Sequence, residues 1–454
     1  MKRKRITPVQ FIPLSFLCLI AVGTLFLLTP WACADGRSAG FLTALFTATT
    51  SVCVTGLVVV DTYAKWSVFG QAVILVLAQI GGLGVVAVGS MLMLIARRKF
   101  SLGSRKLLNE SLNVDLNKGL LAFLTRIFKG VFLVEGIGAA LYSIRFIPAF
   151  GVAKGIWISV FQSVSAFCNA GMDIIGPNSM IDFNTDDLLM WTTMLLIIFG
   201  GLGFVVWYDV VDRIKEAFKY KYTPGTLIKH LEEHTKLVIT MTLVLLFIGC
   251  GITFAAEYSN PATIGNMGLK DKLLNSLFQS VTFRTAGFAS IPQDALTGST
   301  CMIGYVLMFI GGSPVGTAGG VKTVTFFLVF MNALSYIGGR RESVIFHKRV
   351  GEEVMRKAAA VVFVSFAAVF TITVLFLFGG GVSLADGLYE VVSALATVGL
   401  SRGLTPNLNV YRRILIIISM YLGRIGPISM AIFFSRSVGA ENKIKHSEGT
   451  FYVG

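Results

Sequence analysis

Four short stretches of the chain place a glycine among small or hydroxyl-bearing residues at a nearly constant spacing. The glycines are 115, 116 and 112 residues apart, at Gly56, Gly171, Gly287 and Gly399. A glycine allows the backbone to turn its carbonyl oxygens toward an axis, because the required conformation is costly for residues with a Cβ. Four such stretches around one axis form rings of carbonyl oxygens that replace the hydration shell of a monovalent cation. The pattern therefore predicts a selectivity filter made of four chain segments.

The predicted filter consists of each glycine and the two residues before it, with K+ held by their carbonyl oxygens. Its members are Val54, Thr55 and Gly56; Asn169, Ala170 and Gly171; Thr285, Ala286 and Gly287; and Thr397, Val398 and Gly399. The last triplet matches the Thr-Val-Gly core of potassium-channel filters, but the longer Thr-Val-Gly-Tyr-Gly string is absent. Val54 offers no side-chain oxygen where the other copies have Asn or Thr. We therefore expect a potassium preference that sodium partly challenges.

The composition is that of a membrane protein. Of the 454 residues, 54% are hydrophobic and 14% are charged, and the mean hydropathy is +0.75. Ordinary soluble domains carry about 25% charged residues. Apolar runs close to or above the roughly 18–20 residues that cross a bilayer recur at residues 11–30, 70–95, 120–147, 188–211, 236–256, 301–337, 358–380 and 413–434.

Each quarter of the chain repeats one order of segments: a long apolar helix, a short amphiphilic segment, the glycine stretch and a second long helix. The short segments are too short to cross a bilayer and are predicted to be re-entrant pore helices, at residues 37–50, 154–167, 270–283 and 384–395. The predicted fold is an all-α integral membrane protein with four parallel M1-P-M2 repeats, giving eight transmembrane helices and four pore helices around a pseudo-fourfold pore. The repeats cover residues 1–106, 107–225, 226–341 and 342–454, the last with a cytoplasmic tail.

A second glycine motif follows each filter stretch by 24 to 29 residues, beginning at Gly81, Gly200, Gly311 and Gly423. Small residues at these points allow helices to pack closely around a centre. In the third repeat the motif continues as a run rich in glycine, from Gly311 to Thr323, that contains too many helix breakers for a continuous helix. A strand does not precede it and Val321 interrupts the Walker pattern, which excludes a phosphate-binding loop. We predict an irregular intramembrane segment that acts as a gate.

Arg424 takes the second-glycine place of the motif in the fourth repeat, inside an apolar helix. A lone intramembrane arginine is costly and suggests function, so we predict that it repels cations below the filter and docks on the glycine-rich segment. Lys322 either contributes to the gate or snorkels to the inner surface, and Arg284 braces the end of the third pore helix. The predicted gate comprises Gly311, Gly312, Gly316, Thr317, Ala318, Gly319, Gly320, Lys322 and Arg424.

The net charge of +15 comes from basic clusters between alternate apolar runs, at residues 2–5, 97–118, 213–236, 340–357 and 436–445. By the positive-inside rule these loops and both termini are cytoplasmic, so nucleic-acid binding is not expected. The six cysteines lack a CxxC pair, and the histidines (His230, His234, His347 and His446) lack metal-site spacing. Glu135 and Asp209 suit buried counter-ions, but the sequence names no partner for them.

These residues resemble those of one family over essentially the whole chain. Val-Cys-Val-Thr-Gly-Leu, Phe-Arg-Thr-Ala-Gly-Phe and Gly-Thr-Ala-Gly-Gly-Val-Lys-Thr, together with Arg424, are similar to motifs of the potassium-translocating membrane subunit of the bacterial Ktr/Trk/HKT superfamily. Because the chain begins directly with the first repeat, the resemblance is greatest to Ktr-type subunits.

The resemblance implies potassium uptake across the bacterial cytoplasmic membrane. It further implies a homodimer, each protomer with its own pore, surrounded by membrane lipid and docked on a cytosolic regulatory ring of nucleotide-binding (RCK-type) subunits. ATP, ADP or another nucleotide is expected on that partner, while this chain carries no cofactor of its own.

Two other classes of function remain as alternatives. A secondary transporter of the same fold, catalysing Na+-coupled potassium symport or Na+ uptake, could use broken helices to form a midplane site. A membrane enzyme is disfavoured, because the sequence shows no metal cluster, catalytic carboxylate pair or nucleophile motif.

Overall fold

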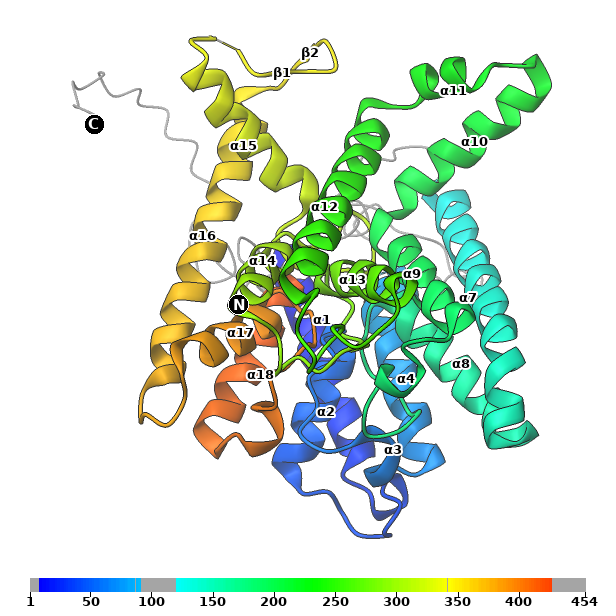
Figure 1. Cartoon of the computed structure of the whole chain (residues 1–454), viewed down its shortest axis with the longest axis vertical. Coiled ribbons are helices and arrows are strands. Elements are labelled where there is room, and N and C mark those ends of the chain that lie inside the picture. The colour runs from blue at the N-terminus through cyan, green and yellow to red at the C-terminus, as the bar shows by residue number, and fades with distance from the viewer. Residues whose placement is uncertain (1–7, 86, 91–119, 341, 427–454) are drawn as a thin grey trace, which may run out of the picture.

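The computed structural model of the chain describes residues 8–85, 87–90, 120–340 and 342–426. The described part is almost entirely helical, with one short β-hairpin. The hairpin lies with α10 and α11 at one end of the molecule, and α3 lies at the opposite end (Figure 1). The predicted basic clusters at 2–5, 97–118 and 436–445, and His446, fall outside the described residues.

The helices follow one order in each quarter. The first quarter contains α1 (Pro8–Leu27), η1 (Pro30–Ala32), α2 (Phe41–Cys53), α3 (Thr62–Lys65) and α4 (Val68–Leu83). The second contains α7 (Leu120–Phe150), α8 (Val152–Cys168), η2 (Ile181–Phe183), α9 (Asp187–Leu202), α10 (Phe204–Tyr220) and α11 (Pro224–His230). The third contains α12 (Glu233–Glu257), α13 (Leu269–Phe283), α14 (Gly298–Phe309) and α15 (Thr323–Ile337). The fourth contains β1 (Val344–Ile345), β2 (Lys348–Arg349), α16 (Glu352–Leu377), α17 (Leu384–Leu395), η3 (Thr405–Asn407) and α18 (Val410–Ile425).

The second long helix of each quarter begins with the same device. α4, α9, α14 and α18 each follow a residue whose side-chain oxygen accepts a hydrogen bond from a backbone N–H of the first turn, which satisfies one of the free donors there. The capping residues are Ser67, Asp186, Thr297 and Asn409. This local signal fixes where the chain turns back after each glycine stretch.

The quarters pack in a closed cycle. Each short helix preceding a glycine stretch contacts its own quarter's long helices, and α4 contacts α8, α9 contacts α13, and α14 contacts α17. The cycle closes where α18 packs on α2. The four short helices are therefore surrounded by the rest of the chain, which explains why the ends of α2, α8, α13 and α17 are buried.

Among the described residues, three helices are by themselves long and apolar enough to cross a membrane, at Ala122–Phe150, Glu233–Glu257 and Glu352–Leu377. Along α16, Phe363, Phe366 and Phe370 are exposed at 64–74%, as expected for side chains that meet lipid. The arrangement is that of a multi-pass membrane protein.

Two of the predicted continuous spans are wrong. The span expected at 188–211 divides into α9 and α10, which are bent by 99° at Gly203, and the one at 70–95 breaks after Leu83. In both, the last glycine of the second motif has a positive φ, 90° at Gly84 and 91° at Gly203, which ends an α-helix. Gly426 ends α18 with the same φ of 91°, and the predicted span at 413–434 continues beyond the described residues. The break predicted after Gly311 is confirmed, since α14 ends at Phe309 and α15 begins at Thr323.

Candidate ion path and gate

The four glycine stretches begin with residues in an uncommon backbone conformation. Val54, Asn169, Thr285 and Thr397 have φ values of 55°, 57°, 65° and 53°, in the left-handed region. β-Branched residues rarely adopt this conformation, and it persists only where the surrounding structure imposes it, commonly at functional sites. One such residue follows each short helix and turns the chain out of the helical conformation.

The four glycines lie in a closed ring. A Cβ built on Gly56 would be 2.6 Å from the carbonyl oxygen of Ala170, and one on Gly171 would be 2.7 Å from that of Ala286. For Gly287 the same contact is with Val398 O at 2.5 Å, and for Gly399 it is with Thr55 O at 2.2 Å. Each glycine therefore faces the carbonyl of the residue before the next glycine, and the fourth segment returns to the first. A side chain at any of these positions would collide with the neighbouring backbone.

Several side-chain oxygens at the ring have no protein partner. Thr285 Oγ1 and Thr397 Oγ1 are buried without a hydrogen bond in the described part of the chain, and so is Thr55 Oγ1. In the hydrogen-bonded orientation of its amide, Asn169 donates to Ala166 O at 3.1 Å and Ile197 O at 3.3 Å, which leaves its oxygen able to accept. Buried hydroxyls normally have partners, so a cluster of free ones points to a ligand. Thr55, expected from the sequence to offer only its backbone carbonyl, therefore also presents a free hydroxyl.

Hydroxyl groups of the short helices brace the glycine segments. Thr50 Oγ1 accepts a hydrogen bond from Gly56 N at 3.0 Å, and Ser393 Oγ accepts one from Gly399 N at 3.1 Å. Thr282 Oγ1 donates to Phe288 O at 2.6 Å, and Ser165 Oγ donates to Met172 O. Sequence reasoning missed these residues, although a Ser or Thr five or six positions before each glycine was the available signal.

The second glycine motif packs against the last turn of the short helices. A Cβ on Gly81, Gly200 or Gly423 would lie 2.0, 1.9 and 1.9 Å from a carbonyl oxygen, in each case that of the residue four before the ring glycine. These carbonyls belong to Val52, Phe167 and Leu395. The expected close packing is thus confirmed in three quarters.

In the third quarter the chain between α14 and α15 forms an irregular loop from Gly311 to Lys322, the glycine loop. Ser313 N donates to Gly201 O at 2.9 Å and Thr317 N donates to Gly200 O at 3.0 Å, so the glycine loop satisfies carbonyl groups near the end of α9. Thr317 Oγ1 reaches Phe167 O at 3.0 Å. A Cβ on Gly319 would lie 2.0 Å from Thr397 Oγ1. The glycine loop therefore lies directly against the base of the ring.

Arg424 joins the glycine loop to the first quarter. Its Nη1 donates to Thr317 O at 2.6 Å, and its Nη2 donates to Gly81 O at 2.5 Å and Gly82 O at 3.1 Å. Arg424, the glycine loop, Phe16, Val85 and Phe204 line a cavity of about 370 Å3. Lys322 Nζ donates to Ala318 O at 2.6 Å, so this side chain folds onto the loop and does not extend to the surface.

Known proteins share the sequence pattern and the fold of this chain. The family model of the TrkH cation transport proteins matches residues 7–444. The chain belongs to this family. It is 34% identical to Ktr system potassium uptake protein B of Bacillus subtilis (strain 168), over 99% of this chain and 97% of that protein. It is 35% identical to potassium/sodium uptake protein NtpJ of Enterococcus hirae, over 100% of this chain and 98% of that one.

The solved structure of the potassium transporter TrkH from Vibrio parahaemolyticus has the same fold, with a TM-score of 0.73 at 15% identity. The match covers 96% of this chain and 86% of the TrkH chain. The family is one of cation transporters and not a class of enzymes.

Arg284, Glu135 and Asp209 of this TrkH-family chain each have at least one hydrogen-bond or ion-pair partner. Arg284, with 8% of its surface exposed, donates to Gly311 O at 3.2 Å, so it connects the third glycine segment to the glycine loop as well as ending α13. Glu135 accepts a hydrogen bond from Gln79 at 3.2 Å, and Asp209 pairs with Arg213 at 3.4 Å. The described residues contain no cluster of His, Cys, Asp and Glu that could hold a metal ion.

Proposed function

We propose that this chain is the pore-forming subunit of a potassium uptake system, with a selectivity filter built from backbone carbonyl groups. The observation that carries the proposal is the ring in which each of four glycines faces a carbonyl of the next segment. Such an arrangement is suited to replacing the water around a monovalent cation. The potassium uptake proteins among the relatives support K+ as the transported ion.

The filter comprises residues 54–56, 169–171, 285–287 and 397–399. The free hydroxyls of Thr285 and Thr397 support additional ligands at its base, where Val54 provides none. In this proposal the chain forms four M1-P-M2 repeats at 1–106, 107–225, 226–341 and 342–454 in the bacterial cytoplasmic membrane, with both termini cytoplasmic. The cyclic packing of the helices supports this division.

The glycine loop and Arg424 are the proposed gate. The loop lies against the base of the ring, and the hydrogen bond from Arg424 to Thr317 O fixes it there. The positive guanidinium group adds an electrostatic barrier to cations. Opening requires the loop to leave this position, under the control of a cytosolic ring of nucleotide-binding (RCK-type) subunits that carry ATP or ADP. The Ktr-system names of the relatives support a partner of this kind, and the pore-forming subunit itself is proposed to be a homodimer.

The test of the proposed function is Rb+ uptake into vesicles that contain the purified protein, measured with increasing Na+. We expect uptake that K+ inhibits strongly and Na+ weakly. Gly56→Ser should make Na+ a better competitor, because its side chain would collide with Ala170 O at 2.6 Å. Gly40→Ser is the matched control, since Gly40 also has a positive φ of 81° but meets nothing within 4 Å.

An unchanged potassium-to-sodium preference in Gly56→Ser would show that the ring of glycines is not the selectivity filter. Sodium-driven accumulation of Rb+ with counterflow, in place of passive flux, would instead favour a Na+-coupled symporter of the same fold. The asymmetric base of the ring and the potassium/sodium uptake relative make sodium the ion to vary in this experiment.

A further inference from the structure

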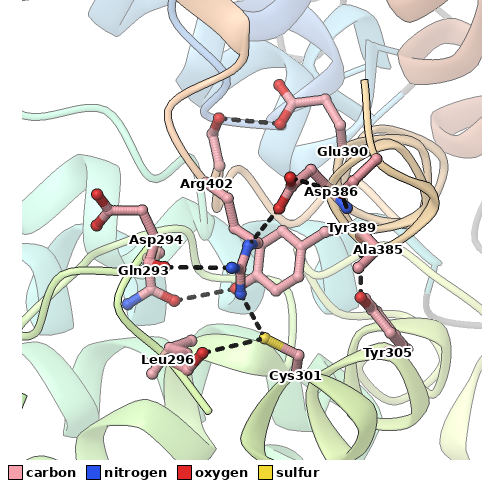
Figure 2. Close-up of polar contacts among 12 residues, drawn as sticks. Gln293, Asp294, Leu296, Cys301, Tyr305, Ala385, Asp386, Tyr389, Glu390 and Arg402 are labelled. Carbon is pink, nitrogen blue, oxygen red and sulfur yellow. Dashed lines mark hydrogen bonds and ion pairs between the residues drawn. The ribbon is translucent and has the colours of Figure 1, made fainter. Parts of the chain in front are cut away.

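Ser401 and Arg402, two and three residues after the last filter glycine, are held by the helix that precedes the fourth filter segment. Ser401 Oγ donates to Glu390 Oε2 at 2.9 Å, and Arg402 Nε donates to Asp386 Oδ1 at 2.7 Å (Figure 2). Asp386 and Glu390 are four residues apart on α17 and so lie on one face of that helix. Thr405 Oγ1 donates to the second oxygen of Glu390. Consecutive residues of the chain are thus fixed at consecutive turns of the helix.

Glu390 is completely buried, with 0% of its surface exposed. A carboxylate in such a place is tolerated only when its oxygens are hydrogen-bonded, and the hydroxyls of Ser401 and Thr405 provide this. Of the four short helices, α2 and α8 have no acidic residue, and α13 has one only in its first turn. Among the four short helices, α17 is therefore the one that carries a buried carboxylate.

Arg402 also connects this segment to the third quarter. Its Nη1 lies 2.6 Å from Cys301 Sγ on α14, and its Nη2 donates to Asp294 O at 3.2 Å (Figure 2). Close by, Tyr389 Oη donates to Gln293 Oε1 at 3.0 Å. Gln293 and Asp294 follow the third filter glycine by six and seven residues, so the chain segments that leave two adjacent filter segments share one polar network.

We propose that Glu390 and Arg402 form a clamp, the exit clamp, that positions the carbonyl groups of Val398 and Gly399 and thereby sets the discrimination between K+ and Na+. The proposal rests on the proposed function. Gly399 N is fixed to Ser393 on the inner side, and the exit clamp fixes the chain two residues further out. Between these anchors the carbonyls cannot move inward to meet a smaller ion. Both residues are positioning residues, since neither contacts the ion.

Glu390→Gln tests the clamp with almost no change in volume. The amide group cannot accept from both hydroxyls with equal strength, so the segment after Gly399 loosens. We expect the Na+ concentration that halves Rb+ uptake to fall roughly five-fold or more, the equivalent of about 1 kcal/mol, while uptake without Na+ stays within about two-fold. Arg402→Met should act in the same direction, and Arg402→Lys should restore part of the discrimination because it keeps one donor.

Two matched controls separate positioning from stability. Glu257 is equally buried, and its two oxygens also accept hydrogen bonds outside the exit clamp: Oε1 from Thr297 Oγ1 at 2.7 Å and Oε2 from Thr263 Oγ1 at 2.8 Å. Arg412 likewise donates to Phe376 O at 2.9 Å and Gly380 O at 2.6 Å. Glu257→Gln and Arg412→Met should lower the melting temperature without changing the Na+ competition.

The exit clamp is overturned if Glu390→Gln and Arg402→Met fold and keep the competition of the wild type, or if the control variants change it equally. Failure of the wild type to take up Rb+ refutes the proposed function instead. In that case the exit clamp is tested by measuring the melting temperatures of the same purified proteins in KCl and in NaCl. A difference between the two salts that Glu390→Gln abolishes supports it, and an unaltered difference overturns it.

Discussion

Replacement of Arg424 with alanine is the sharpest test of the gate. In the structure this side chain is the bridge between the glycine loop, at Thr317 O, and the end of α4, at Gly81 O and Gly82 O. The alanine variant removes the bridge and the positive charge together. It leaves the glycine loop with its backbone contacts to Gly200 and Gly201, so the loop can still fold but is held less firmly under the ring.

The size of the effect follows from the bonds that are lost. A hydrogen bond from a charged group contributes about 1.5–3 kcal/mol, and about 1.4 kcal/mol corresponds to a factor of ten in an equilibrium constant. Loss of the bond to Thr317 O therefore shifts the closed-to-open ratio of the loop by roughly ten-fold to a hundred-fold. Removal of the charge from the path lowers the barrier to cations further.

The assay is the initial rate of Rb+ uptake into vesicles that contain the purified chain without its cytosolic partner. We expect Arg424→Ala to raise this rate about ten-fold or more. Arg424→Lys should fall between the wild type and the alanine variant, because one ammonium group keeps the charge but cannot reach the loop and α4 together. Wild-type rates in folded alanine and lysine variants would refute the assignment of Arg424 to the gate.

Two further substitutions test the contact between the glycine loop and the ring. Gly319→Ala places a methyl group 2.0 Å from Thr397 Oγ1. Overpacking of this kind costs about 1–3 kcal/mol, so the closed position of the loop is destabilised and basal Rb+ uptake should rise. Gly298→Ala is the control, because its methyl group meets nothing within 4 Å and should leave basal uptake unchanged. A fall in uptake for Gly319→Ala would contradict the gate. Thr397→Val removes a free hydroxyl without changing the size of the side chain, and valine is tolerated in this backbone conformation because Val54 has a φ of 55°. The substitution should raise the half-saturating Rb+ concentration roughly five-fold. An unchanged concentration would show that this hydroxyl does not contact the ion.

The ring of glycines could be predicted from the sequence because its cause is local. Each position requires a residue without a Cβ, and a glycine accordingly recurs four times at nearly equal intervals along the chain. The short helices were placed within a few residues for the same reason, since α8 ends at Cys168, directly before Asn169, and α13 ends at Phe283, two residues before Thr285. The opening after Gly311 was equally visible as a run of helix breakers.

The bends after α4 and α9 were not anticipated, although their signal was present. The second glycine motif was interpreted only as a packing surface, but its last glycine, at Gly84 and Gly203, has a positive φ and ends the helix. One motif thus has two physical roles, and periodicity alone reveals the first. Length was no guide either, because α9 and α4 have 16 residues each and α8 has 17.

The exit clamp lay beyond sequence reasoning for a different reason. Asp386 and Arg402 are 16 residues apart with a glycine segment between them, and nothing local states that the chain returns to the same helix face. Cys301 is a further hundred residues away. Polar partners of this kind are set by the three-dimensional path of the chain, as is the pairing of Arg424 with Thr317.

The ring closes between Gly399 and the carbonyl of Thr55, two ends of one chain. During synthesis the first three segments are made before the fourth. The contact between Thr55 and Gly399 can therefore form only after more than three hundred further residues have been added. A chain that stops before α17 would hold three segments and an open side. The same continuity allows each quarter to change by a single substitution, where an assembly of four identical subunits would change all its quarters at once. In the proposed filter, a single substitution therefore changes the ligands that one quarter offers to the ion.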